Sequence, residues 1–476
     1  MSHLDLERPE SRPGLVPLTR LRAGAPAEAW DEERLRVLEG HLAAFESQLS
    51  EGERTAFGAL FGARTTALTA LGAVPPEEIL DAEERELVAR LAAEPRPIRT
   101  GLPRSLALVM KGTRLCNLRC TYCSSWSDDR NQVMTFPVLA RATRDALAGP
   151  GIRDVQFVWH GGETTLRPLS FYRKALWLQE RFRRPGQRVT NSVQTNGTHL
   201  TPEWLDFLKR YRVSTAVSLD GPPEIHDRRR VDTRGRPTSE RARAGLRKLQ
   251  EHGISHNILM VVDQDVVQLG AERLLEYLLS IDVRVVGLLN VAPEGDPSRP
   301  SEDEPYMDFG EYVEFLRALF RLWYPRWVDR ISFHELSGLL SKVGGGPGSS
   351  CTHNGNCVGT VFTVEPQGDV YHCDKYQNCP EFRFGNVLEG SLLDAFSAPP
   401  LLHARGYTQF GIDLARGCRW SHVCRGGCPY DRYVRVVRKG GVQDERCCGL
   451  APLLSDMEEA LGAAAPGRRE AEAAIG

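Results

Sequence analysis

The sequence lacks the features that would place the protein in a membrane, on nucleic acid or outside the cell. No stretch approaches the ~18 uncharged apolar residues that a membrane-spanning helix needs. The net charge is only −2 over 476 residues, so no excess of basic side chains indicates nucleic acid or a membrane surface as partner. The start, MSHLDLERPESRPG, is polar and acidic, so we expect no secretory signal and a cytoplasmic protein.

Cysteine is absent from two long parts of the chain, residues 1–115 and 124–350. Three cysteines stand at 116–123, and the other nine lie at 351–448. In a reducing compartment, such groups are metal ligands or catalytic thiols more often than a disulfide framework. Since cysteines of a structural core would scatter, the two groups predict metal chemistry in two places.

Composition and periodicity divide the chain into four parts. Residues 1–103 are rich in Ala, Leu and Glu, and Ala29–Leu49 carries apolar residues at helical spacing. They predict a helical N-terminal module, which is either a packing accessory or an element that docks substrate. Residues 104–343 form the next domain, residues 344–460 hold the nine later cysteines, and residues 461–476 are a polar tail expected to fray.

Between residues 104 and 343, short β-rich runs alternate about six times with amphipathic helical segments. The predicted strands are 106–110, 155–159, 188–195, 214–220, 256–262 and 283–291. This alternation predicts an α/β fold with a parallel sheet and right-handed crossovers. In such sheets, the loops at the carboxyl ends of the strands carry the chemistry.

The motif RLCNLRCTYCSSW directly follows the first predicted strand. Its spacing is C-x3-C-x2-C, formed by Cys116, Cys120 and Cys123. A [4Fe–4S] cluster normally takes four thiolates, so three would leave one iron without a protein ligand. An open coordination position is typical of a reactive metal rather than a structural one. Zinc is the alternative, although zinc ribbons prefer paired C-x2-C knuckles.

The spacing, its place after the first strand and the motifs that follow resemble the radical S-adenosylmethionine (SAM) superfamily. The segment HGGETTL after the second strand resembles that family's Gly-Gly-Glu-Pro motif, with Thr164 where proline is usual. The resemblance implies that the open iron binds SAM and that electron transfer cleaves SAM to a 5′-deoxyadenosyl radical. It also implies that Glu163 accepts hydrogen bonds from the SAM ammonium group.

Further SAM contacts follow from the same resemblance. Gly161 and Gly162 let the backbone approach a ligand closely. Ser218 matches the position expected to hold the SAM carboxylate, and Arg230 is a second candidate because a guanidinium suits a carboxylate. The segment VQTNGT adds Thr195 and Asn196. An aromatic residue usually follows the third cysteine; here Ser124 stands there, so the adenine contact either shifts to Trp126 or differs.

The C-terminal cysteines resemble the SPASM extension, which binds two auxiliary [4Fe–4S] clusters. The resemblance assigns four ligands to the first auxiliary cluster: Cys351, Cys357, Cys373 and Cys428. For the second cluster there remain Cys418, Cys424, Cys447 and Cys448. Ala415 stands where the family has a further cysteine. The adjacent pair then supplies both missing thiolates, or Asp413 or Cys379 serves as a ligand, or one iron stays open. The alternative is a single auxiliary cluster, together with zinc or with no second metal.

Residues 105–460 look most similar to the anaerobic sulfatase-maturating enzymes. Asp374 falls on the position that those enzymes use as a base, although an aspartate beside a cluster ligand is equally a hydrogen-bond partner. The N-terminal region and three residues depart from the sulfatase-maturase pattern: Thr164, Ser124 and Ala415. These departures favour a sister group, the radical SAM/SPASM maturases of ribosomally made peptides.

The prediction is therefore a partial (β/α)6 radical SAM barrel with a helical N-terminal module and a C-terminal cysteine-rich SPASM iron–sulfur domain. It cleaves SAM, oxidises a residue of a peptide or protein to a crosslink, a thioether or similar, and takes electrons from a reductant of flavodoxin or ferredoxin type. Formylglycine formation on a sulfatase Cys or Ser is the second hypothesis. The third, a non-catalytic iron–sulfur or zinc carrier or scaffold, would not need Glu163, Ser218 and an open cluster together.

Overall fold

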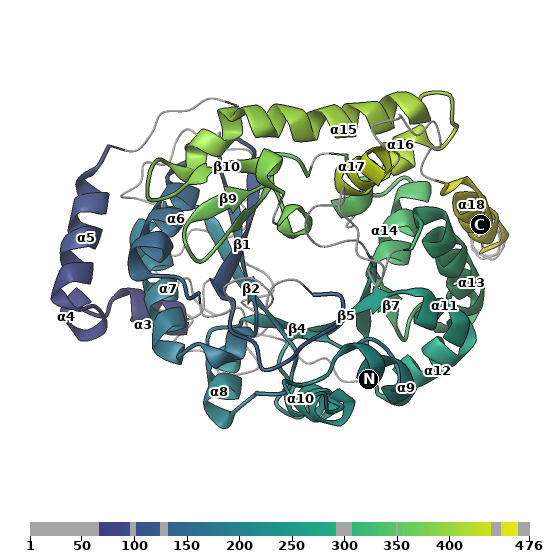
Figure 1. The fold of residues 1–476 in the computed structure, drawn as a ribbon, viewed down its shortest axis with the longest axis horizontal. Helices are drawn as coiled ribbons and strands as arrows, with labels where there is room; N and C mark the ends of the chain where they lie inside the picture. Colours follow the sequence, from purple (N-terminus) through teal and green to yellow (C-terminus); the bar gives the residue numbers. More distant parts are fainter. Residues whose placement is uncertain are drawn as a thin grey trace, which may run out of the picture. The chain divides into compact units, whose positions relative to one another are not determined.

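The computed structural model describes residues 66–95, 101–123, 132–291, 307–348, 351–355, 357–377, 379–438 and 449–464. All of them belong to one compact unit, Arg64–Gly476. Within them, a ten-stranded sheet has the order β10-β9-β8-β1-β2-β3-β4-β5-β6-β7 (Figure 1). The predicted helix Ala29–Leu49 lies outside the described residues, as do Ser124 and Trp126.

All six predicted strands are present, and each pairs in parallel with the next along the chain. Their bounds are β1 (Ser105–Thr113), β2 (Asp154–Gly161), β3 (Arg188–Thr195), β4 (Ser214–Ser218), β5 (His256–Val262) and β6 (Val285–Asn290). The predicted α/β fold of repeated βα units is therefore confirmed.

Four further strands, which we did not predict from the sequence, extend both edges of the sheet. β7 (Ser332–Phe333) pairs in parallel with β6, and β8 (Val361–Val364) pairs in parallel with β1. β9 (Asp369–Tyr371) and β10 (Arg383–Asn386) follow as antiparallel neighbours. The cysteine-rich region thus joins the sheet directly beside β1. The predicted domain limits after residues 103, 343 and 460 stay predictions.

Amphipathic helices pack on the outer face of the sheet. The helices between the strands are α6 (Phe136–Ala148), α7 (Leu169–Phe182), α8 (Pro202–Arg210), α9 (Pro223–Arg229), α10 (Ser239–Glu251), α11 (Gln264–Leu269), α12 (Ala271–Ser280), α13 (Phe309–Trp327) and α14 (His334–Val343). α8 shows how the sequence sets such a helix: Thr201 caps it by accepting from Trp204 N, and Pro202 occupies its first turn. Trp204 and Leu208 then bury its apolar side.

The remaining helices flank this core. Before the sheet come α3 (Thr66–Gly72), α4 (Pro76–Ile79) and α5 (Ala82–Ala93). The C-terminal region adds the short turn η5 (Asp374–Tyr376) and the helices α15 (Pro399–Ala415), α16 (Ser421–Cys424), α17 (Pro429–Arg438) and α18 (Ala451–Ala464). Within the described residues, no helix is both long and apolar enough to cross a membrane.

Strand alternation decides which side chains face inward, away from the helices. In β1, Leu108 and Met110 are buried on the outer side, which leaves Lys111 on the inner side. In β2, Trp159 packs edge-to-face on Tyr172 of α7 with ring centroids 5.4 Å apart, so the next residue, His160, faces inward. The carboxyl ends of these strands therefore carry polar side chains on the inner face.

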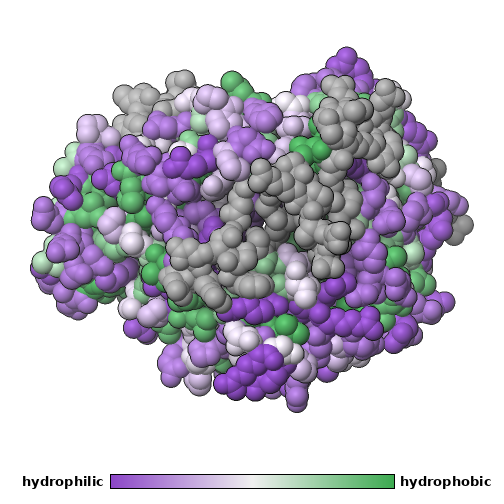
Figure 2. All heavy atoms as spheres, in the orientation of Figure 1, coloured by the Kyte–Doolittle hydropathy of each residue, from purple (hydrophilic) through white to green (hydrophobic). Residues whose placement is uncertain are grey.

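The coloured part of the face drawn in Figure 2 is mainly hydrophilic. On the face drawn in Figure 2, hydrophobic side chains lie in small separate areas among hydrophilic ones. Among the described residues, the most exposed large apolar side chains are Leu402 and Leu388, with 65% and 46% of their surface accessible. Single exposed apolar residues such as these are normal in folded proteins.

Candidate active site

The N-terminal cysteine loop (residues 114–123) leaves the carboxyl end of β1 and is fixed by backbone hydrogen bonds. Arg119 N donates to Val231 O at 2.7 Å, and Thr121 N donates to Arg229 O at 3.0 Å. These bonds tie the loop to the segment that ends α9. The loop carries the three predicted ligands, of which the second is buried and the others half-buried: Cys116, Cys120 and Cys123.

The Glu163 carboxylate lies beneath this loop and is 1% exposed. Its Oε1 accepts from Thr165 N at 3.0 Å, Thr165 Oγ1 at 2.6 Å and Thr195 Oγ1 at 2.6 Å. Its Oε2 accepts only from Asn196 N, at 2.7 Å, among the described residues. Asn196 Nδ2 in turn donates to Asn117 Oδ1 at 2.8 Å, which links the network to the cysteine loop. Three predicted SAM contacts, Glu163, Thr195 and Asn196, are thus brought together.

The two glycines before Glu163 lie against the start of the cysteine loop. A Cβ on Gly161 would stand 2.1 Å from Thr113 O, and one on Gly162 would stand 2.2 Å from Leu115 O. Gly161 also has a φ of +124°, which other residues rarely adopt. We expected these glycines to let the backbone approach a ligand. In the structure, the lack of a side chain at both positions also lets two backbone segments come into contact.

Arg230 and Asp220 form a buried ion pair beside the second cysteine. Arg230 Nε donates to Asp220 Oδ2 at 2.7 Å and Nη2 donates to Oδ1 at 3.2 Å, while Nη1 lies 4.0 Å from Cys120 Sγ. Asp220 also accepts from Tyr122 Oη at 2.6 Å and from Val261 N at 3.0 Å. Burial opposes ionisation of Asp220, yet Arg230 holds its pKa below the usual value. Arg230 is therefore engaged within the protein.

Ser218 ends β4 on the inner face. Its Oγ accepts a hydrogen bond from Gln194 Nε2 of β3 at 2.8 Å. Within the described residues no hydrogen bond is donated by the Ser218 hydroxyl, so its proton remains available to an acceptor such as a carboxylate.

Four C-terminal cysteines come together from separate segments. Burial first, and then Cys428 and Cys357, raise the pKa of the Cys373 thiol well above its usual value. Burial and the nearby Cys351 raise the pKa of Cys357 to about 12. Cys373 and Cys428 also pack against the same aromatic cluster, so these thiols lie near one another. We call the four predicted ligands of the first auxiliary cluster the C-terminal thiol set: Cys351, Cys357, Cys373 and Cys428.

The ligands predicted for the second auxiliary cluster are only partly described. Cys418 and Cys424 pack against the main core, whereas Cys379 lies in a separate aromatic cluster beside the C-terminal thiol set. Asp413 accepts from Arg416 at 2.6 Å on the surface. The structure thus groups Cys379 with the other thiols, and Ala415 is buried without a donor atom. Two predicted ligands lie outside the described residues: Cys447 and Cys448.

Asp374 belongs to η5, directly after a predicted cluster ligand, and reaches the ends of β1 and β2. Lys111 Nζ forms an ion pair with Asp374 Oδ1 and donates to Gln377 Oε1 at 2.9 Å. His160 Nδ1 lies 3.9 Å from Asp374 Oδ2. Burial opposes ionisation of Asp374, but Lys111 and then His160 lower its pKa to about 2. Its side chain remains 41% exposed.

The donor set fits iron–sulfur clusters better than a single metal ion. Burial raises the pKa of Cys116 to about 12, and the Glu163 carboxylate acts in the same direction. A thiolate there needs a compensating cation, which a cluster supplies. Among the described residues, no three His, Cys, Asp or Glu side chains form a site for one metal ion. Thiols around a cubane bind different irons, so they stand farther apart than ligands of one ion.

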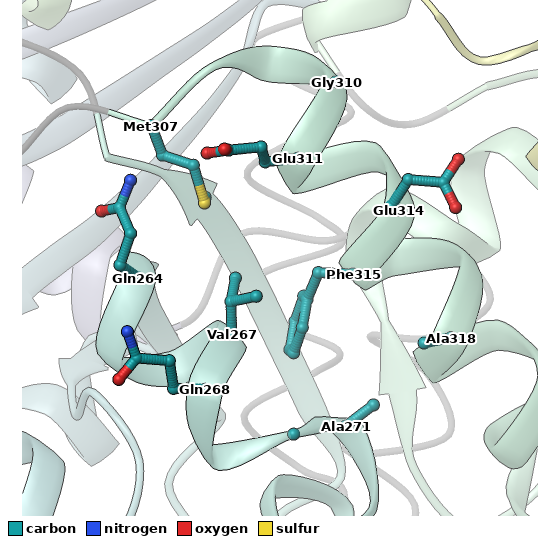
Figure 3. A pocket seen from close by; sticks show the side chains of 11 residues that line it. Gln264, Val267, Gln268, Ala271, Met307, Gly310, Glu311, Glu314, Phe315 and Ala318 are labelled. Carbon is teal, nitrogen blue, oxygen red and sulfur yellow. The ribbon is translucent and has the colours of Figure 1, made fainter.

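A separate cavity of about 720 Å³ lies between α11, α12 and α13. Its lining is mostly apolar, with Val267 and Phe315 inside and Glu311 and Glu314 from α13 (Figure 3). None of the predicted ligand or SAM-contact residues lines it. This cavity is therefore separate from the residues that we predict to hold the clusters and SAM.

Several residues of the site were not assigned from the sequence, and Lys111, His160 and Asp220 stand out among them. Lys111 is a lysine inside an otherwise apolar strand, which was a signal for a buried charge. His160 and Asp220 stand inside the motifs HGGETTL and SLDG, where only neighbouring residues were assigned roles. Their partners come from other segments of the chain, so one sequence cannot identify those partners.

Comparisons with known proteins agree with this arrangement. Residues 110–268 match the model of the Radical SAM superfamily. A serine-type anaerobic sulfatase-maturating enzyme of Klebsiella aerogenes is 31% identical over 344 residues, 71% of this chain and 82% of that protein. A cysteine-type anaerobic sulfatase-maturating enzyme of Clostridium perfringens is 29% identical over 338 residues, 69% of this chain and 89% of that one. A solved structure, native anSMEcpe with bound AdoMet and Kp18Cys peptide, has a TM-score of 0.64 at 27% identity, covering 75% of this chain and 96% of its own.

Proposed function

The chain belongs to the radical SAM family that includes the anaerobic sulfatase-maturating enzymes, and from that premise we propose that it oxidises a Cys or Ser side chain of a peptide or protein to an aldehyde. It is an enzyme that uses SAM and [4Fe–4S] clusters. The observation that carries the proposal is the ion pair between Lys111 and Asp374. It brings the residue next to Cys373 to the carboxyl end of β1, where the cysteine loop begins.

In this proposal the SAM-binding cluster is held by Cys116, Cys120 and Cys123. When bound, SAM and the reduced cluster supply a radical that removes a hydrogen atom from the substrate. Glu163 Oε2 has capacity for a further hydrogen bond and would orient the SAM ammonium. Ser218 would donate to the SAM carboxylate, because Arg230 already gives two nitrogens to Asp220.

The C-terminal thiol set would hold the first auxiliary cluster, which would supply the acceptor for the second electron of the oxidation. Cys418, Cys424, Cys447 and Cys448 would hold the second. We further propose an external one-electron reductant of flavodoxin or ferredoxin type, a cytoplasmic location, and a chain divided into 1–103, 104–343, 344–460 and 461–476.

Ala415 favours one second candidate function. In this candidate only one of Cys447 and Cys448 binds the second auxiliary cluster, and the buried Ala415, which stands in place of a cysteine, leaves one iron without a thiolate. An open iron there would bind a thiol of the substrate, as formation of a thioether or crosslink in a ribosomally made peptide requires.

The test uses the reconstituted, reduced full-length protein with SAM and two sulfatase peptides, one with Cys and one with Ser at the target position. We expect 5′-deoxyadenosine together with the mass change of aldehyde formation on at least one peptide. Release of 5′-deoxyadenosine without change in either peptide would reject the sulfatase proposal and leave the peptide-crosslinking candidate.

A further inference from the structure

Lys111 and His160 are neighbours across two strands. They are register partners in the pairing of β1 with β2, and both face the inner side of the sheet. Trp159, the residue before His160, instead packs on the outer side against α7. The two side chains therefore stand together at the carboxyl ends of the strands, where the cysteine loop begins.

Asp374 connects this pair to the C-terminal region. Lys111 Nζ occupies Asp374 Oδ1, which leaves Oδ2 as the oxygen nearest His160. The distance from Oδ2 to His160 Nδ1 is 3.9 Å, and in free enzymes the hydrogen bonds of catalytic groups are often longer than in the substrate complex. Lys111 thus fixes the carboxylate in a position to orient the imidazole.

The His160 ring has a buried edge and an open edge. Nδ1 is inaccessible to solvent and has no hydrogen-bond partner in the described part of the chain, although an Asp374 oxygen lies nearby. The side chain as a whole is 27% exposed, so its accessible atoms lie away from Nδ1. A neutral imidazole that carries its proton on Nδ1, toward the carboxylate, offers the lone pair of Nε2 on its open edge.

We propose that His160 is the catalytic residue that takes the substrate proton, while Asp374 is a positioning residue that orients it. This inference rests on the proposed function and changes the role predicted for Asp374. In a substrate –CH2–XH, with X sulfur or oxygen, the carbon gives a hydrogen atom to the radical supplied by SAM. An auxiliary [4Fe–4S] cluster would supply the acceptor for one electron, and His160 Nε2 would take the X–H proton, which leaves –CH=X. With X oxygen this is the aldehyde, and with X sulfur water would replace the sulfur, which leaves as H2S. Burial lowers the pKa of His160 to about 4, which keeps the ring neutral beforehand.

The test compares His160→Gln, Asp374→Asn and the double variant of the full-length reconstituted protein. The probe is a sulfatase peptide with Cys at the target position, and the readouts are iron content, 5′-deoxyadenosine and peptide product. A general base contributes about 10²–10⁴-fold, so we expect each variant to lose product by about that factor while iron and SAM cleavage persist. The double variant should lose little more, because residues that act as one unit are not additive.

A rescue experiment separates a proton acceptor from a structural residue. His160→Ala should regain product when imidazole is added, whereas Asp374→Asn should not. His256→Gln, at the opposite end of β5, is the matched control and should keep the product rate of the wild type. Wild-type product formation by His160→Gln would overturn the proposal and leave Asp374 as the base. A wild-type protein that changes neither a Cys nor a Ser sulfatase peptide would instead reject the proposed function and this inference with it.

Discussion

The two groups of thiols are assembled in different ways. The N-terminal cysteine loop takes its three from one continuous stretch, residues 116–123, that backbone hydrogen bonds hold against residues 229–231. The C-terminal thiol set draws its four from separate segments between residues 351 and 428. A local loop keeps its shape through its own backbone, whereas thiols collected from distant segments depend on the fold around them and on the metal that joins them.

The charges around the two groups differ as well. Beside the loop, the buried acids Glu163 and Asp220 are satisfied by hydrogen bonds and by Arg230. Beside the C-terminal set, lysines bridge segments: Lys375 Nζ lies 3.0 Å from Asp431 Oδ1, and Lys342 Nζ donates to Val423 O at 2.8 Å. In the first region, hydrogen bonds and one arginine thus satisfy buried acids, whereas in the second, lysines tie chain segments together.

The largest expected effect tests the loop. We predict that Cys116→Ala, Cys120→Ala or Cys123→Ala each abolishes release of 5′-deoxyadenosine from SAM by the reduced protein. With all three clusters filled, iron should approach ~12 per chain, at four per cubane. Loss of the loop cluster should leave roughly 8, because the C-terminal thiols bind independently of it. Undiminished SAM cleavage in any of these variants would contradict the ligand assignment.

The second prediction removes the metal. Chelation of all iron should make residues 344–460 sensitive to protease, because the C-terminal thiol set loses the crosslinks that join its segments. Residues 132–291 should stay protected, because the parallel strands there pair without any metal. Mapping of the cleavage sites by mass spectrometry checks this prediction. Equal protection of both regions after chelation would contradict it.

The sequence predicted the local region far better than the distributed one. The six strands and the C-x3-C-x2-C loop are short-range patterns, and all are present in the structure. β7 to β10 have only two to four residues each, too few to show a period, so we did not predict that β8 pairs with β1. The contact between Lys111 and Asp374 depends on that pairing, so it could not be predicted from the sequence either.

The third prediction breaks the ion pair beside the loop. Asp220→Asn leaves Arg230 buried without its charge partner, which should lower the free energy of unfolding by about 3–5 kcal/mol. The matched control is Asp282→Asn at the exposed pair with Arg330, which should cost about 0–1 kcal/mol. Urea unfolding of both variants gives the two values. Equal, small losses would show that the pair beside Cys120 does not stabilise the loop region.

The smallest expected effect concerns the second auxiliary cluster. Ala415 is buried three residues before Cys418, and its carbonyl accepts from Cys418 N at 2.9 Å, so the two positions lie in one turn. Ala415→Cys would add a thiolate there, and the packed site would have to accommodate one additional sulfur atom. We predict that wild-type protein and variant bind the same amount of iron, but that a chelator removes one cluster more slowly from the variant, by about 10-fold, since changes around metal ligands alter affinity by about 10–100-fold.

The control is Ala146→Cys on α6, which introduces a buried thiol away from the cysteine region and should release iron like the wild type. If both variants release iron more slowly, any additional buried thiol has this effect and Ala415 is not special. If Ala415→Cys releases iron at the rate of the wild type, Cys447 and Cys448 already complete the ligand set.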